Sequence, residues 1–170
     1  MNIQKFTQKS IEAINDCQKI ANDYGNPSVD CEHFLYALLQ QENSLIARLI
    51  EKMGTDVQAF TGRVLQLIEA KPKVQGGQQH VGQSFNDVLL SGEDEARAMG
   101  DEYVSVEHLF LAMIRKGSKE IKELFRTFGI NREEFLKALS TVRGNQKITS
   151  EKYITPYYLS LVKTDDYILG

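Results

Sequence analysis

Apolar residues recur along this chain at intervals of three and four, the spacing that places them on one face of an α-helix. Residues 11–24 show this spacing, and residues 31–39 form a more continuous apolar segment. Two further segments, residues 44–53 and about 57–70, follow after short polar breaks. The pattern therefore predicts four helices in the first part of the chain.

The expected helix ends have the residues that helix termini favour. Thr7 is suited to be an N-cap, with Phe6 before it and Ile11 after it in the hydrophobic staple arrangement. Gly25 and Gly54 follow the first and third helices, and glycine adopts the left-handed conformation found at such positions without strain. These signals support helices at the predicted places.

The whole pattern occurs twice. Residues 32–39 read Glu-His-Phe-Leu-Tyr-Ala-Leu-Leu, and residues 107–114 read Glu-His-Leu-Phe-Leu-Ala-Met-Ile, an offset of 75 residues (108 − 33). The same offset, without a gap, relates four further pairs: Ala21 and Ala96, Gly25 and Gly100, Gly54 and Gly129, Phe60 and Phe135. Such a repeat predicts two copies of one structural unit, with the first helix of the second copy over residues 85–99.

The residues expected to cap the helices change between the copies but keep their chemistry. The caps of the first copy and their replacements in the second are Asp30 and Ser105, Asn43 and Ser118, Asp56 and Asn131. Each has a short side chain whose oxygen can accept a hydrogen bond from a free N–H at a helix N-terminus. The predicted fold is all-α, with two tandem four-helix repeats packed with pseudo-twofold symmetry.

These observations divide the chain into a domain, residues 1–143, and a tail. The domain consists of repeat one at about 3–70, a linker at 71–83 that is rich in glycine and glutamine, and repeat two at about 84–143. Gly92 lies inside a predicted helix, where it costs about 1 kcal/mol relative to alanine. A tertiary contact must therefore compensate for it.

The tail, residues 144–170, has a different character. Four of the seven tyrosines fall in its last eighteen residues: Tyr153, Tyr157, Tyr158 and Tyr167. Residues 153–162 resemble a strand interrupted by Pro156, without a helical period. The tail is a vector-derived extension, a divergent linker or a short strand, and the sequence leaves these alternatives open.

Composition excludes several classes of protein. The net charge of −3 over 170 residues gives no basic surface for nucleic acid. No apolar run approaches the roughly 18 residues that span a bilayer, and the N-terminus lacks a signal-peptide core. The two cysteines, Cys17 and Cys31, are too few for a disulfide framework and are expected to be small core residues. We expect a cytoplasmic protein with no nucleic-acid or membrane partner.

Motifs of catalysis and metal binding are missing from the sequence. There is no phosphate-binding loop, no paired Cys-x-x-Cys and no nucleophile elbow. Cys31 and His33 are two residues apart but lack further ligands for zinc. Each histidine of the repeated Glu-His pair is expected to be buried and hydrogen-bonded, and each glutamate, Glu32 or Glu107, to meet the positive end of a helix dipole. We predict no metal site and no enzyme activity in this chain.

Three motifs resemble the Clp N-terminal domain, the double-repeat helical module at the head of Clp-type AAA+ unfoldases. They are Phe6-Thr7-x-Lys-Ser-x-Glu-Ala, Val29-x-x-Glu32-His33-x-Leu35-x-Ala37-Leu38-Leu39 and Tyr103-Val104-x-x-Glu107-His108-Leu109. The resemblance covers about residues 3–149. It is greatest to ClpB-type disaggregases, because of the glycine- and glutamine-rich linker and a junction-like segment at residues 142–150. After residue 151 the sequence departs from the family, as in an isolated or truncated domain with a foreign tail.

The resemblance implies a monomeric module that engages unfolded or aggregated protein clients and helps deliver them to the pore of a hexameric AAA+ chaperone. ATP and Mg²⁺ are expected only in AAA+ modules outside this chain, so no cofactor is predicted here. Family positions that engage clients map onto Thr7, Asp101 and Glu107. The alternative is a docking domain for an adaptor protein in a protease-linked ClpC- or ClpA-type unfoldase. Client specificity and the parent's oligomeric state stay open.

A physical mechanism can be proposed beside the resemblance. Unfolded chains expose apolar side chains and unpaired backbone, so a receptor for them needs a shallow apolar groove with polar edges. The residues expected to line it, where the repeats meet, are Leu89, Leu90, Tyr103, Val104 and Leu109. Asp101, Glu102 and Glu107 would form an acidic rim that favours basic client segments. The competing interpretations are core positions for Leu89 and Leu109 and a solvated turn for Asp101.

Overall fold

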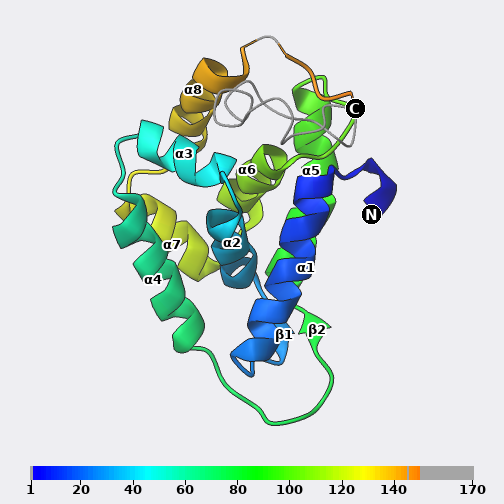
Figure 1. Ribbon diagram of the computed structural model, residues 1–170, viewed down its shortest axis with the longest axis vertical. Helices are drawn as coiled ribbons and strands as arrows, with labels where there is room; N and C mark the ends of the chain where they lie inside the picture. Colours follow the sequence, from blue (N-terminus) through cyan, green and yellow to red (C-terminus); the bar gives the residue numbers. More distant parts are fainter. Residues whose placement is uncertain (1, 145, 150–170) are drawn as a thin grey trace.

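The computed structural model describes residues 2–144 and 146–149, and these contain two sets of four α-helices (Figure 1). The first set is α1 (Gln8–Asp23), α2 (Cys31–Gln40), α3 (Leu45–Lys52) and α4 (Val57–Glu69). The second set is α5 (Gln83–Ala98), α6 (Val106–Lys116), α7 (Lys119–Thr127) and α8 (Arg132–Arg143). A short 3₁₀ turn, Ile3–Lys5, precedes α1. The two four-helix repeats and the all-α fold predicted from the sequence are confirmed.

Each repeat pairs with the segment that precedes the first helix of the other repeat. Strand β1 (Ser28–Val29) pairs in parallel with β2 (His80–Val81), and Phe6 pairs in parallel with Val104. Adding the repeat offset to Phe6 and Val29 gives Val81 and Val104, so the two pairings are equivalent. This exchange supports the pseudo-twofold relation. It also places the end of the predicted linker, residues 71–83, in a strand and at the start of α5.

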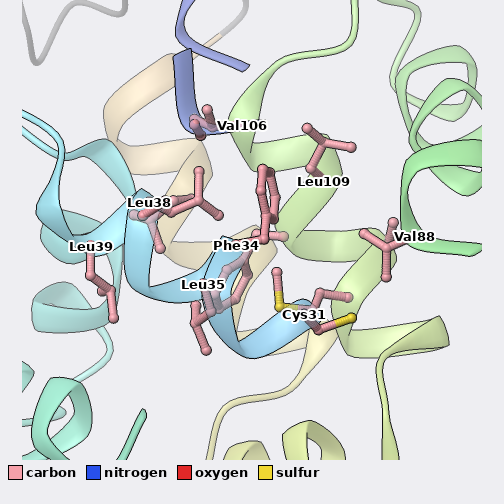
Figure 2. Close-up of a cluster of buried hydrophobic side chains, with 14 of the residues drawn as sticks. Cys31, Phe34, Leu35, Leu38, Leu39, Val88, Val106 and Leu109 are labelled. Carbon is pink, nitrogen blue, oxygen red and sulfur yellow. The ribbon is translucent and has the colours of Figure 1, made fainter. Parts of the chain in front are cut away.

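The core lies around α2 and α6, the two most completely buried helices. Figure 2 shows Phe34 of α2 among side chains that include Val88 of α5 and Leu109 of α6. The ring of Phe34 also packs against that of Phe85, with centroids 5.2 Å apart. Cys31 lies in the same cluster, where burial raises the pKa of its thiol to about 12. The prediction that this cysteine is a core residue is confirmed.

Side-chain caps begin most helices where the sequence indicated. Thr7 Oγ1 accepts a hydrogen bond from the backbone N–H of Ser10 at 3.3 Å. The prediction of Asn43 as the cap of α3 is wrong by one residue, because Ser44 Oγ accepts the N–H of Ala47 at 3.1 Å. Asn43 instead adopts a left-handed backbone conformation with φ of 54°. The helix therefore starts one residue later than its sequence pattern implied.

Two further sequence expectations concern membrane-spanning helices and the tail. None of the helices in residues 2–144 and 146–149 combines the length and the apolar character needed to cross a bilayer. The predictions for the tail at 150–170 lie outside the described residues.

Candidate functional site

The loop between α5 and α6 contains Asp101, whose carboxylate is held by His108. Nδ1 of His108 accepts the backbone N–H of Ser105 at 2.8 Å, so the ring proton is on the other nitrogen. Nε2 of His108 therefore donates to Oδ2 of Asp101, at 2.7 Å. The predicted buried, hydrogen-bonded histidine is confirmed at this position.

The second oxygen of Asp101 accepts two further hydrogen bonds. One comes from the guanidinium of Arg143 and one from the backbone N–H of Ile148, at 3.0 Å. Burial by itself would raise the pKa of Asp101, but the hydrogen bonds from His108, Arg143 and Ile148 outweigh it and hold this pKa well below its ordinary value. Asp101 is therefore a buried, ionised group rather than a solvated turn residue.

Thr7 lies beside this loop, although it is far away in the sequence. Its backbone N–H donates to the carbonyl oxygen of Val104 at 3.0 Å, and the hydroxyl of Ser10 donates to the same oxygen at 3.0 Å. The side chain of Thr7 is buried beneath these contacts. The structure thus brings Thr7 and the loop of Asp101 together.

Glu107 does not lie on an accessible rim. It is fully buried; its Oε1 accepts the hydroxyl of Ser105, and its Oε2 has no hydrogen-bond partner within the described residues. The equivalent Glu32 is also buried, with Oε1 at 3.5 Å from Nζ of Lys71. Burial raises the pKa of Glu32, although the charge of Lys71 opposes this. The predicted acidic rim is therefore wrong at Glu107 and Asp101, whose side chains are covered by protein, and only Glu102 of the three acids is exposed.

The apolar groove predicted at the seam between the repeats is largely filled. Leu89, Val104 and Leu109 are buried, and Figure 2 shows Leu109 inside the core cluster. The prediction that Leu89 and Leu109 line an open groove is therefore wrong, because close packing of α5 against α6 removes them from solvent. Val104 is also buried, but it lines a small pocket beside Asp101. Leu90 remains 48% exposed, and Tyr103 is half-buried. These two are the accessible apolar positions of the predicted set.

The accessible surface near Asp101 is a shallow pocket of about 190 Å³. It is lined by Lys5, Glu93 and Arg97, together with Ala96, Asp101, Glu102 and Val104. Lys5, Glu93 and Arg97 were not predicted from the sequence. Lys5 reaches this place only through the pairing of residues 5–7 with Val104, and no local pattern signals that pairing.

A cation–π contact crosses the same surface. Nζ of Lys5 lies 5.6 Å from the centroid of the Tyr103 ring. Glu93 and Arg97 add opposite charges along the outer face of α5, which also contains the exposed Leu90. We call Leu90, Glu93, Arg97, Glu102 and Tyr103 the α5 strip. It mixes both signs of charge with modest apolar area.

A larger hollow, of about 430 Å³, lies between α6, α7 and the start of α8. Its floor contains Ile114, Phe125 and Ile130, and two exposed cations, Lys122 and Arg126, stand at its edge. None of the residues proposed from the sequence lies there. Within residues 2–144 and 146–149 no group of three or more histidine, cysteine or acidic side chains is placed to hold a metal ion.

Comparison with known sequences identifies what the chain is similar to. The family described as Clp repeat (R) N-terminal domain matches residues 5–128. The chaperone protein ClpB of Nitratidesulfovibrio vulgaris is 39% identical over 156 residues, which are 88% of this chain and 18% of that protein. The ClpB of Bacillus anthracis is 35% identical over 156 residues, 89% of this chain and 18% of its own. The chain thus spans about a fifth of the length of these relatives.

Several solved structures with a similar fold are described as N-terminal domains. The Hsp104 N-terminal domain of Candida albicans has a TM-score of 0.76 at 21% identity, covering 86% of this chain and 97% of that one. The N-domain of ClpV from Vibrio cholerae has a TM-score of 0.69 at 19% identity, and the match covers 82% of this chain and 85% of that one. A third, described as a complex of the ClpV N-domain with VipB peptide, has a TM-score of 0.66 at 22% identity, and the match covers 81% of this chain and 86% of that one. At these identities the likeness concerns the fold.

Proposed function

The chain belongs to the family of Clp repeat N-terminal domains, and we propose that it engages unfolded or aggregated polypeptide as the N-terminal module of a ClpB-type chaperone. Since the chain spans 18% of the ClpB relatives, the hexameric AAA+ assembly and its ATP-driven activity also belong to the proposal. In it, this chain binds clients and performs no chemistry of its own.

The α5 strip is the observation that most supports client binding. An unfolded client has unpaired backbone and exposed apolar side chains, and the strip combines an exposed leucine, a half-buried tyrosine and charged side chains of both signs. Three of its residues, Glu93, Arg97 and Glu102, line the pocket that also contains Asp101, one of the positions that the family resemblance indicated. A surface this small gives a transient interface, so we expect a dissociation constant in the micromolar range or weaker.

An NMR titration of the full chain with a reduced, denatured protein tests this function. We expect chemical-shift changes at Leu90, Glu93 and Tyr103. Leu90→Asp should weaken binding several-fold. Val74→Asp is the matched control, because Val74 is 53% exposed but lies in the linker, away from the strip. Shift changes confined to residues 72–79, or to the hollow beside α7, would contradict the proposed site.

The second candidate is docking of an adaptor or another specific peptide. The solved ClpV N-domain with VipB peptide shows that one protein of similar fold binds a peptide, at 22% identity to this chain. The same titration distinguishes the two functions. Binding of several unrelated denatured proteins at one surface favours client engagement, whereas binding of one peptide with no response to denatured proteins favours docking.

A further inference from the structure

The chain that follows α8 turns back and lies against the loop between α5 and α6. The backbone N–H of Ile148 donates to Oδ1 of Asp101 at 3.0 Å, and its carbonyl oxygen accepts the N–H of Glu102 at 2.8 Å. The side chain of Ile148 is fully buried. One residue of the returning chain is therefore bound through its N–H, its carbonyl and its apolar side chain.

Lys147 contributes a charge to the same contact. Its Nζ donates to the carbonyl oxygen of Met99 at 2.8 Å, at the C-terminal end of α5. The side chain passes over Gly100, since a Cβ atom built there would lie 3.7 Å from Nζ. The C-terminus of a helix has partial negative charge and free carbonyl groups, so this position favours a cation.

Comparison with the equivalent loop of repeat one separates the features of this contact that both repeats share from those found only in repeat two. There, too, the chain after the fourth helix returns: the N–H of Val74 donates to Gly25 O at 2.8 Å, and Nδ2 of Asn26 donates to Pro72 O at 3.0 Å. Asn26 is the counterpart of Asp101. A returning segment is thus common to both repeats, but Asp101 supplies an ionised acceptor for backbone N–H where repeat one has a neutral amide that donates.

From this arrangement we infer that the Asp101 site binds extended client segments in which a cationic residue precedes an aliphatic one. Lys147 and Ile148 occupy the site within the chain until a client displaces them. The inference rests on the proposed function and names its substrate class. The contacts of Ile148 use main-chain groups that every unfolded polypeptide offers. The neighbouring pocket beside Glu102 and Lys5 has room for the client residues next to this pair.

Occupation by a tethered segment makes the wild-type chain a weaker receptor than its site allows. A segment held by a short tether has an effective concentration in the millimolar range, and a free client must compete with it. Removing the internal segment should therefore strengthen binding of a free peptide at least tenfold. A peptide of the same sequence should show the effect most directly.

The test uses acetyl-Gln-Lys-Ile-Thr-amide, the sequence of residues 146–149, and the full chain with Ile148→Asp. We expect the peptide to bind the variant at least tenfold more tightly than wild type, with amide shifts at Asp101 and Glu102. A peptide with glutamate in place of lysine, and one N-methylated at isoleucine, should not bind. Thr149→Asp is the matched control, because Thr149 is exposed, and it should bind the peptide as wild type does.

A denatured client protein separates this inference from the proposed function. Tighter client binding by Ile148→Asp, together with competition between client and peptide, supports the inference. Equal client binding by wild type and variant overturns it and leaves the proposed function in place, and so does a peptide that the client does not displace. No client binding by either protein overturns the function and the inference together. Should circular dichroism show that Ile148→Asp is unfolded, Lys147→Ala, at an exposed side chain, provides the same comparison.

Discussion

Gly92 of α5 lies directly against Leu109 of α6. A Cβ atom built on Gly92 would be 2.8 Å from Cδ2 of Leu109 and 2.9 Å from Cγ1 of Val104, closer than carbon atoms approach in proteins. The glycine inside this helix, which its propensity disfavours, is therefore required by the approach of α6. This contact is the tertiary compensation that was predicted for a glycine inside a helix. The close packing of α6 on α5 also fills the predicted groove.

We predict that Gly92→Ala destabilises the domain by about 1–2 kcal/mol. Alanine is favoured over glycine in a helix by about 1 kcal/mol, but an overpacked core typically costs about 1–3 kcal/mol. Gly62→Ala in α4 is the control, because nothing lies within 4 Å of a Cβ built there, and it should stabilise by up to about 1 kcal/mol. Urea denaturation followed by circular dichroism measures both. Stabilisation by both substitutions would show that Leu109 can move aside.

Glu95 joins three helices of repeat two, and its removal should be costly. The carboxylate is 3% exposed; it forms two hydrogen bonds with Arg132, at 2.7 and 3.0 Å, and lies 3.3 Å from Nε of Arg115. We expect Glu95→Ala to lower the free energy of unfolding by about 2 kcal/mol, the scale of charge-assisted hydrogen bonds at a buried group.

Glu123→Ala is the control for the pair on Glu95. Nη1 of Arg126 lies 3.5 Å from Oε1 of Glu123, and both side chains are more than 60% exposed. Glu123→Ala should therefore lower the free energy of unfolding by no more than about 0.5 kcal/mol. The unfolding free energies of both variants, measured at low and high salt, check the comparison. A loss at Glu95 as small as that at Glu123 would mean that the buried pair adds no stability.

His33 should make the domain sensitive to mild acid. Burial, helped by the charge of Lys71, lowers the pKa of His33 to about 4, whereas an unfolded histidine titrates near 6.5. The unfolded state therefore takes up a proton first as pH falls. The contribution of neutral His33 to the free energy of unfolding is fully present above about pH 6.5. It is lost as the pH falls towards 4, by about 3 kcal/mol in total. His33→Gln should be less stable at pH 7 but show a flatter dependence on pH.

His80→Gln is the matched control for this pH dependence, because His80 is exposed on β2. Its unfolding free energy between pH 7 and 4 should follow that of the wild type. A His33→Gln variant that still loses stability as steeply as wild type over this range would assign the effect to other groups.

Asp101→Asn should remove an acid-sensitive contribution at lower pH. The depressed pKa of Asp101 gives stability that is present above the unfolded value near 3.9 and is lost as pH falls further. Below about pH 4 the wild type should therefore lose stability more steeply than the variant. At pH 7 the variant should be about 2 kcal/mol less stable, because three donors lose a charged acceptor.

Asp94→Asn, at an exposed ion pair with Arg97, is the control for Asp101→Asn. It should change the free energy of unfolding by no more than about 0.5 kcal/mol at either pH. Parallel acid unfolding of wild type and Asp101→Asn would contradict the role of this carboxylate.

Much of the fold could be predicted because its signals are local. The apolar spacing of α1 and α2, the caps at Thr7 and Asp56 and the glycine after α3 each depend on a few neighbouring residues. The candidate site was predicted less completely. Thr7 and Asp101 were named through a family resemblance, whereas Lys5 and Arg97 were missed, since only the pairing of Phe6 with Val104 brings residue 5 to this loop.

The amino-acid sequence by itself determined the duplication, because helix period, capping and stop residues recur at one offset and require no knowledge of distant contacts. Only the tertiary structure decided which side chains meet solvent. The side chains of Leu109 and Glu107 are covered because α6 packs closely against its neighbours, while Leu90 is exposed although it lies between the buried Leu89 and Ser91. Burial depends on what the rest of the chain places over a residue, and a local pattern holds no information about that.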